Sequence, residues 1–138
     1  MKKYLIARCS SIGQKLDSQI AELKKAHPDH DELITGFRSG VSAKNKAELQ
    51  RYIDMCDEGH SLVFLRLSRV SRSLTQSLWF FAAAEKKKIN VILVKEKIDF
   101  STPAGRFQAH MMMVCYQYQK EIQLENAREG RRHAESKK

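Results

Sequence analysis

The segment LVFLRLSRVSRSLTQSLWFFAAAEKK, residues 62–87, contains three successive patterns that together decide the fold. It begins with a short apolar run at 62–65, typical of a buried strand, and ends with apolar side chains at helical spacing over 73–87. Between these lie serines and three arginines that recur at every third position: Arg66, Arg69 and Arg72. The segment therefore predicts a strand, a basic loop and a helix, in that order.

The same order of strand and helix repeats through most of the chain. Apolar runs predict strands at 4–9, 33–37, 62–65 and 91–94. Helical spacing predicts helices at 14–26, 47–56 and 73–87. The inward faces of the last two helices are expected to consist of Leu49, Ile53 and Cys56, and of Leu74, Leu78, Phe81 and Ala82. This alternation favours an α/β fold with a largely parallel sheet.

The last part of the chain predicts one long helix. After a loop at 98–105 that contains Thr102-Pro103, there is no glycine or proline until Gly130. A helix over 103–130 would be roughly 40 Å long, whereas a domain of about 100 residues has a radius of gyration near 13 Å. It would overhang its own domain and carry apolar residues with it, which predicts a homodimer through this helix.

The alternative for the apolar stretch HMMMVCY, residues 110–116, is that it belongs to the core of the domain. Met111 and Cys115 are expected in the core, on a face shared with Phe107, Tyr118 and Ile122. Met112 and Met113 lie on other faces of the helix, so burying them as well would require a second surface.

The chain is strongly basic, with 25 Lys and Arg against 16 Asp and Glu and a formal net charge of +9. The excess lies in the middle: residues 60–106 hold nine basic side chains but only three acidic ones, Glu85, Glu96 and Asp99. Such a balance favours nucleic acid or another anionic surface as partner, while solubility alone is the plainer explanation.

Three widely spaced cysteines without a CxxC pair indicate reduced thiols in the cytoplasm, not a disulfide framework or a zinc site. The apolar runs are too short for a membrane helix, and the start, MKKYLIARCSS, does not fit a signal peptide. No membrane partner, metal or cofactor is expected.

Three predicted strand ends carry serine and basic residues. Arg8 and Ser10 follow the first strand, the loop SGVSAKN at 39–45 follows the second, and the arginines follow the third. Ligands of open parallel sheets bind at this edge. Because no Walker motif and no carboxylate cluster accompany them, a metal-free phosphoryl transfer by a serine nucleophile is indicated. The alternative for Ser10 is an ordinary hydroxyl at a strand end.

Four segments in order resemble the motifs of the serine recombinases, the resolvase/invertase family: YLIARCSSIGQKLDSQIAEL at 4–23, SGVSAKNKAELQRYID at 39–54, RLSRVSRSL at 66–74 and IDFSTPAGR at 98–106. The resemblance extends from residue 3 to about 130. It implies a three-layer α/β sandwich with a mostly parallel central sheet and a long C-terminal dimerisation helix.

The resemblance also implies a reaction, site-specific DNA recombination without metal or cofactor. A serine attacks the DNA phosphodiester, a 5′-phosphoserine forms, a 3′-hydroxyl leaves, and a tetramer exchanges and rejoins the strands. By position, Ser10 is the nucleophile, and Arg8, Arg69 and Arg72 bind the scissile phosphate. Gln14 and Ser39 match further site positions, while Arg66 is a supporting or solvated charge.

Four positions depart from the family pattern. Ser68 stands where the family has an aspartate, Lys46 where it has an arginine, and Gln119-Lys120 where it has a Glu-Arg pair. Lys46 and Lys120 keep a charge that can bind phosphate, although lysine lacks the bidentate fork of arginine. The departures leave a second function class open, a non-catalytic relative that binds DNA or regulates. A nucleotide binder would need a glycine-rich first loop, and CSSIGQ has one glycine.

The resemblance predicts three parts: a catalytic α/β domain at 1–102, the helix at 103–130 and a basic tail at 131–138. Contacts with DNA are expected from Arg106, Arg128, Arg131 and Arg132, although the tail can equally be a solubilising end. The helix-turn-helix domain of small family members is not recognised in this sequence, so salt-sensitive, non-specific DNA binding is expected. Encoding by a prokaryote, a phage or another mobile element is implied.

Overall fold

The structure is a computed structural model that describes residues 1–9, 16–37 and 41–136. Its strands are β1 (Lys3–Cys9), β2 (Glu32–Phe37), β3 (Ser61–Phe64), β4 (Asn90–Leu93) and β5 (Ile98–Asp99). Its α-helices are α1 (Leu16–Ala26), α2 (Ser42–Asp54), α3 (Leu74–Lys87) and α4 (Pro103–Ser136), and a 3₁₀ turn, η1, covers Leu67–Arg69. In the part of the chain that is described, no helix is both long and apolar enough to cross a membrane.

The strands form one sheet in the order β2-β1-β3-β4-β5. The first four are parallel, and only β5 runs antiparallel, pairing with β4 through Ile92 opposite Asp99 and Leu93 opposite Ile98. The largely parallel sheet was predicted, but β5 was not, because 98–105 was expected to be a loop. A strand of two residues is too short to show alternation in the sequence.

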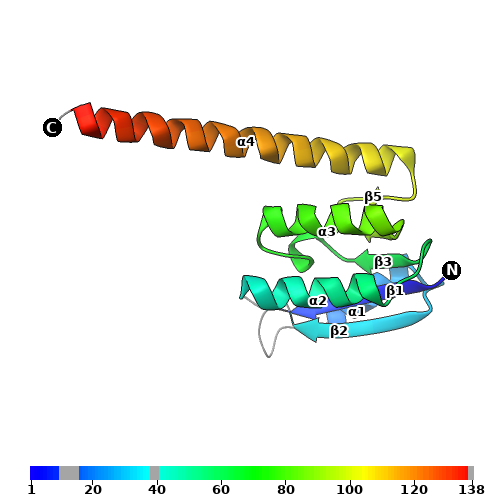
Figure 1. Ribbon diagram of the computed structural model, residues 1–138. Helices are drawn as coiled ribbons and strands as arrows, with labels where there is room; N and C mark the ends of the chain where they lie inside the picture. Colours follow the sequence, from blue (N-terminus) through cyan, green and yellow to red (C-terminus); the bar gives the residue numbers. More distant parts are fainter. Residues whose placement is uncertain (10–15, 38–40, 137–138) are drawn as a thin grey trace.

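Buried side chains pack on both faces of this sheet, because successive residues of a strand point to opposite faces. On β1, Leu5 and Ala7 join Leu23 of α1 in one apolar cluster, whereas Tyr4 and Ile6 join a larger cluster with α2, α3 and the start of α4. The molecule is therefore the three-layer sandwich that the sequence indicates, with α2 and α3 on one face (Figure 1).

Two helices differ in detail from the sequence-based expectation. Helix α2 begins at Ser42, not at 47, so residues expected in a loop occupy its first turns. On α3, Phe81 is buried as expected, but Ala82 is exposed. Two polar residues of α3, Gln76 and Ser77, are buried in the inward face instead.

Helix α4 starts against β5, runs alongside α3 and then extends past the domain (Figure 1). Gly105 lies so close to β5 that a Cβ there would be 1.8 Å from the backbone oxygen of Asp99. Ala109 is buried and Met112 packs against the core. Because the side of α4 that carries Gly105, Ala109 and Met112 faces the domain, the apolar residues on its opposite side face solvent.

The expected core positions of Met111 and Cys115 are therefore wrong. Met111 is 49% exposed and Cys115 is exposed. Met111 follows Ala109 by two residues, about 200° of helix rotation, and so lies on the far side of α4. The expected helix end at residue 130 is also wrong, since α4 continues to Ser136. One glycine in a helix costs only about 1 kcal/mol, and Gly130 does not end it.

Candidate active site

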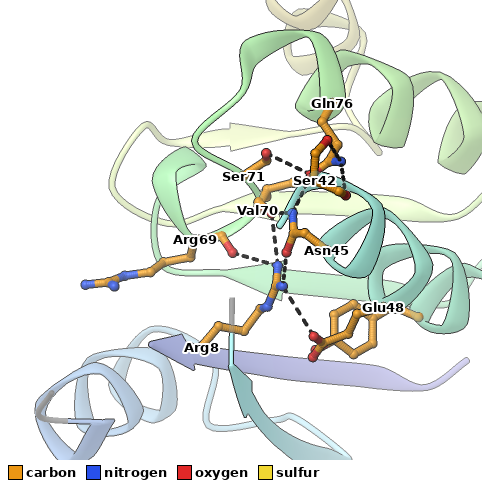
Figure 2. Close-up of polar contacts among 9 residues, drawn as sticks. Arg8, Ser42, Asn45, Glu48, Arg69, Val70, Ser71 and Gln76 are labelled. Carbon is orange, nitrogen blue, oxygen red and sulfur yellow. Dashed lines mark hydrogen bonds and ion pairs between the residues drawn. The ribbon is translucent and has the colours of Figure 1, made fainter. Parts of the chain in front are cut away.

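The ends of β1 and β3 meet at one edge of the sheet, as predicted from the sequence. Pairing of Ile6 with Phe64 places the last residues of β1 beside the loop that follows β3. There, Nη1 of Arg8 donates hydrogen bonds to the backbone oxygens of Arg69 and Val70, at 3.0 and 2.9 Å. The segment 66–72 is hereafter called the arginine loop, and Arg8 fastens it to the sheet (Figure 2).

Arg8 is completely buried, at 0% exposure. Its Nη2 donates to Asn45 Oδ1 and lies 3.6 Å from a carboxylate oxygen of Glu48. Its guanidinium stands 5.7 Å from the centre of the Tyr52 ring, and the Tyr52 hydroxyl donates to Glu48 at 2.5 Å. Burial lowers the pKa of Arg8, and Tyr52 and Glu48 oppose that shift. The guanidinium still keeps its charge in proteins, so this is a buried, paired cation.

The side chain of Gln19 holds the backbone of the same residue. Gln19 Oε1 accepts from the Arg8 N–H at 3.0 Å, and Gln19 Nε2 donates to the Arg8 backbone oxygen at 3.0 Å. Arg8 is thus fixed through its backbone by α1 and through its side chain by α2 and the arginine loop. These hydrogen bonds fix the position of Arg8 and so orient the groups that are bonded to it.

Residues that sequence reasoning missed complete this network. Asn45 Nδ2 donates to the Val70 oxygen at 3.1 Å and also to Gln76 Oε1. Ser71 Oγ donates to Gln76 Oε1 at 2.9 Å, and Gln76 Nε2 donates to the Ser42 oxygen at 2.8 Å. Asn45 and Gln76 each precede a core residue of their helix by four positions. A polar residue in an inward helical face must find partners, and this signal was available in the sequence.

The three arginines of the loop do not point to one place. The guanidinium of Arg69 points away from that of Arg8 (Figure 2), and its buried Nε has no hydrogen-bond partner among the described residues. Arg72 is exposed and shares a hollow of about 490 Å³ with Arg66. The hollow is lined by Arg66, Leu67, Ser68, Ser71, Arg72, Leu74, Ser77 and Glu96.

The interior of this hollow contains hydroxyl groups as well as cations. Ser77 is 1% exposed, and its Oγ has no hydrogen-bond partner within the described part of the chain. Ser71 is also buried, and Ser68 is exposed. The guanidinium groups of Arg66 and Arg72 favour an anion such as phosphate in this hollow, whereas the Glu96 carboxylate in the same lining disfavours one. Across the described ranges, no three His, Cys, Asp or Glu side chains lie together as metal ligands would.

The two lysines that were expected to support the site lie elsewhere. The Lys46 ammonium stands 4.8 Å from the ring centre of Trp79, within the range of a cation–π interaction. Lys120 lines a separate hollow between α3 and α4, together with Trp79 and Leu124. Both side chains therefore lie around Trp79, and Lys46 also shares a hollow with Ser42 and Gln76 of the Arg8 network.

Other predicted residues are partly outside what the structure describes. Ser10, Gln14 and Ser39 lie outside the described residues, and Cys9, the neighbour of Ser10, is the last one described at the end of β1. Arg106 Nη1 donates to the Phe100 oxygen at 3.3 Å, so this side chain holds the start of α4. The remaining expected DNA contacts lie on the distal half of α4: Arg128, Arg131 and Arg132.

Comparisons with known proteins bear on this arrangement. A transposon Tn917 resolvase from Enterococcus faecalis is 30% identical over 124 residues, covering 90% of this chain and 66% of the relative. A DNA-invertase from Escherichia phage P1 is 28% identical over 99 residues, covering 72% of this chain and 53% of the relative. The chain thus spans less than two thirds of the length of these relatives.

Two crystal structures share the fold. A resolvase family site-specific recombinase from Streptococcus pneumoniae has a TM-score of 0.67 at 18% identity, covering 94% of this chain and 95% of that one. The N-terminal catalytic domain of TP901-1 integrase has a TM-score of 0.66 at 20% identity, covering 88% and 98%. A family model described as the resolvase N-terminal domain matches residues 3–138. The chain therefore belongs to the resolvase N-terminal domain family.

Proposed function

We propose that this protein is a serine site-specific recombinase that cleaves and rejoins DNA through a 5′-phosphoserine, with Ser10 as the nucleophile. The observation that carries the proposal is the anchoring of the arginine loop to Arg8, two residues before Ser10. It supports a site in which the end of β1 and the cations after β3 act on one phosphate. The names of the relatives, a resolvase and a DNA-invertase, support DNA as the substrate.

The proposed chemistry needs no metal. The Ser10 hydroxyl oxygen attacks the phosphorus, the bond from phosphorus to the 3′-oxygen breaks, and the serine proton is balanced by protonation of the leaving oxygen. Rejoining is the reverse attack of a 3′-hydroxyl on the phosphoserine. Arg69 and Arg72 supply positive charge at the place where negative charge develops in the transition state. The same two arginines, Ser10 and Arg8 are the residues that the sequence indicates.

In this proposal Arg8 positions the arginine loop and does not bind the phosphate directly. In the structure its guanidinium is buried and bonded to the arginine loop, to Asn45 and to Glu48. It acts on the phosphate through the position of Arg69 and its neighbours. Direct contact with DNA would require the guanidinium to leave these partners.

We further propose a homodimer through α4 and a tetramer during strand exchange. The support is a stripe of exposed apolar residues along α4: Phe107, Met111, Val114, Tyr118 and Ile122. Contiguous exposed apolar surface commonly marks a protein interface. Exposed Arg128 and Arg131 on the distal half of the helix suit contacts with DNA phosphates. We place the protein in the cytoplasm of a bacterium, which its free cysteines and its relative from Enterococcus faecalis support.

A second candidate function is DNA binding without cleavage. It is favoured by Ser68, which cannot carry the charge of a carboxylate, and by Lys46, whose ammonium lies over Trp79. The two functions differ in whether a covalent bond forms.

The deciding experiment mixes the protein with a nicked DNA substrate and separates the products on a denaturing gel. A covalent adduct that is lost in Ser10→Ala and kept in the matched variant Ser11→Ala supports the recombinase. An adduct that persists in Ser10→Ala overturns Ser10 as nucleophile. DNA binding with no adduct from the wild type leaves the second function.

A further inference from the structure

The turn at residues 94–97 lies directly beside the arginine loop. The Val94 and Lys95 N–H groups donate to the backbone oxygens of Phe64 and Leu65, at 3.0 and 2.9 Å. These two bonds continue the β3–β4 pairing into the loops. Lys97 then closes the turn in the left-handed region, with φ 57°. That region is unfavourable for a residue with a Cβ, so contacts around the turn must stabilise this conformation of Lys97.

Glu96 extends from this turn to the start of η1. Its Oε2 accepts from the Leu67 N–H at 2.9 Å. Leu67 is the first residue of η1, and the first N–H groups of a helical turn have no partner within it. A carboxylate there satisfies this donor with a charge-assisted hydrogen bond. Glu96 therefore caps, from another part of the chain, the turn that carries Ser68 and Arg69.

Glu96 also differs from the other two acidic residues of the basic middle segment. Glu85 pairs with His110 on α4, at 3.1 Å. Asp99 Oδ1 accepts from the N–H and hydroxyl of Ser101, at 2.8 and 2.7 Å. Of the three, Glu96 is the one that lines the hollow with Arg66 and Arg72. The hollow also contains Ser68, the position at which the resembled family has an aspartate.

We propose that Glu96 is a positioning residue, which supplies to the arginine loop the carboxylate that residue 68 lacks. The carboxylate reaches the same turn from the segment between β4 and β5. It caps η1 and lines the hollow with Arg66 and Arg72, and so positions the loop that carries Arg69 and Arg72. The proposal rests on the recombinase function for its effect on cleavage, but its structural part is independent of DNA.

The test uses two measurements on the full chain: amide hydrogen exchange at Leu67 without DNA, and the rate of adduct formation with nicked DNA. Glu96→Ala is expected to speed exchange at Leu67 about fivefold and to slow adduct formation about tenfold. Glu96→Gln keeps an acceptor oxygen but loses the charge, so it is expected to slow the adduct with little change in exchange.

Two further variants make the test specific. Adding Ser68→Asp to Glu96→Ala is expected to restore adduct formation to within about threefold of the wild type, because a charge-assisted carboxylate contact returns to the loop. The matched control is Glu22→Ala, which breaks the neighbouring pair of Glu22 with Lys95 at 2.9 Å and leaves Glu96 intact. It is expected to change neither measurement.

The outcomes separate this proposal from the proposed function. Absence of an adduct from the wild type overturns the recombinase function, while exchange at Leu67 still decides the capping role. Wild-type exchange at Leu67 in Glu96→Ala overturns the proposal. So does a double variant that forms adduct no faster than Glu96→Ala. If Glu96→Ala does not fold, a Glu96→Gln protein with wild-type circular dichroism and wild-type adduct rate overturns it equally.

Discussion

Nη1 of Arg8 donates to the backbone oxygen of Val70 at 2.9 Å, across 62 residues of sequence. The bond links the first strand to the loop after the third, and Asn45 donates to the same oxygen at 3.1 Å. Arg8 thus contributes to stability as well as to the position of the site.

Arg8→Ala is expected to lower the free energy of unfolding by about 3 kcal/mol or more, because it removes a donor from the Arg69 and Val70 oxygens and the cation beside Glu48. Urea unfolding measures the loss. Arg51→Ala, an exposed arginine on α2, is the control and is expected to change stability by less than about 0.5 kcal/mol. A small loss in Arg8→Ala would show that the network contributes little to folding.

Stability is expected to fall at alkaline pH because of Cys56. Burial raises the pKa of its thiol from 9.0 to about 11. Between these values the unfolded chain has lost a proton that the folded protein retains, so the free energy of unfolding decreases as pH rises. The expected loss is roughly 1–2 kcal/mol by pH 11.

Urea midpoints of the wild type and Cys56→Ala between pH 8 and 11 isolate the contribution of this thiol. Cys56→Ala is expected to be less stable than the wild type at pH 8. Its free energy of unfolding is expected to fall less than that of the wild type between pH 8 and pH 11. Parallel curves for the two proteins would contradict the assigned titration, since Tyr4 and Tyr52, whose pKa values are also raised, are present in both.

The two glycines of α4 are expected to respond in opposite ways to alanine. Gly105→Ala places a Cβ 1.8 Å from the Asp99 oxygen, so the free energy of unfolding, measured with urea, is expected to fall by about 3 kcal/mol or more. Gly130 has nothing within 4 Å of that position. Gly130→Ala is therefore expected to favour the helix locally by about 0.5–1 kcal/mol, slowing amide exchange around residue 130. A stable Gly105→Ala protein would mean that α4 can leave β5 without cost.

The apolar stripe on α4 gives a prediction about assembly. Met111→Lys is expected to weaken the proposed dimer at least about tenfold, since an ammonium would be desolvated in the interface. The urea midpoint of the monomer should not change, because Met111 is 49% exposed. Sedimentation equilibrium measures the effect, with Gln108→Lys as an exposed control on the same helix. An unaltered dimer in Met111→Lys would place the interface elsewhere.

The four parallel strands of the sheet were predictable because each is a compact apolar run bounded by polar residues. Which side of α4 faces the domain was not predictable. Its apolar stripe fits either the core or a partner, and the choice depends on the close approach of Gly105 to β5, a tertiary contact with no local pattern. The buried state of Arg8 is similar, since a charged residue after an apolar run is usually solvated. Its partners come from three separate segments.

The hollows near Lys46 and Lys120 share Trp79, the one tryptophan in the sequence. Its indole lies where α2, α3 and α4 approach one another, with the Lys46 ammonium 4.8 Å from the ring centre. The protein therefore contains a built-in optical reporter. A change in tryptophan emission on adding DNA or on separating α4 from the domain would come from this junction alone, without any attached label.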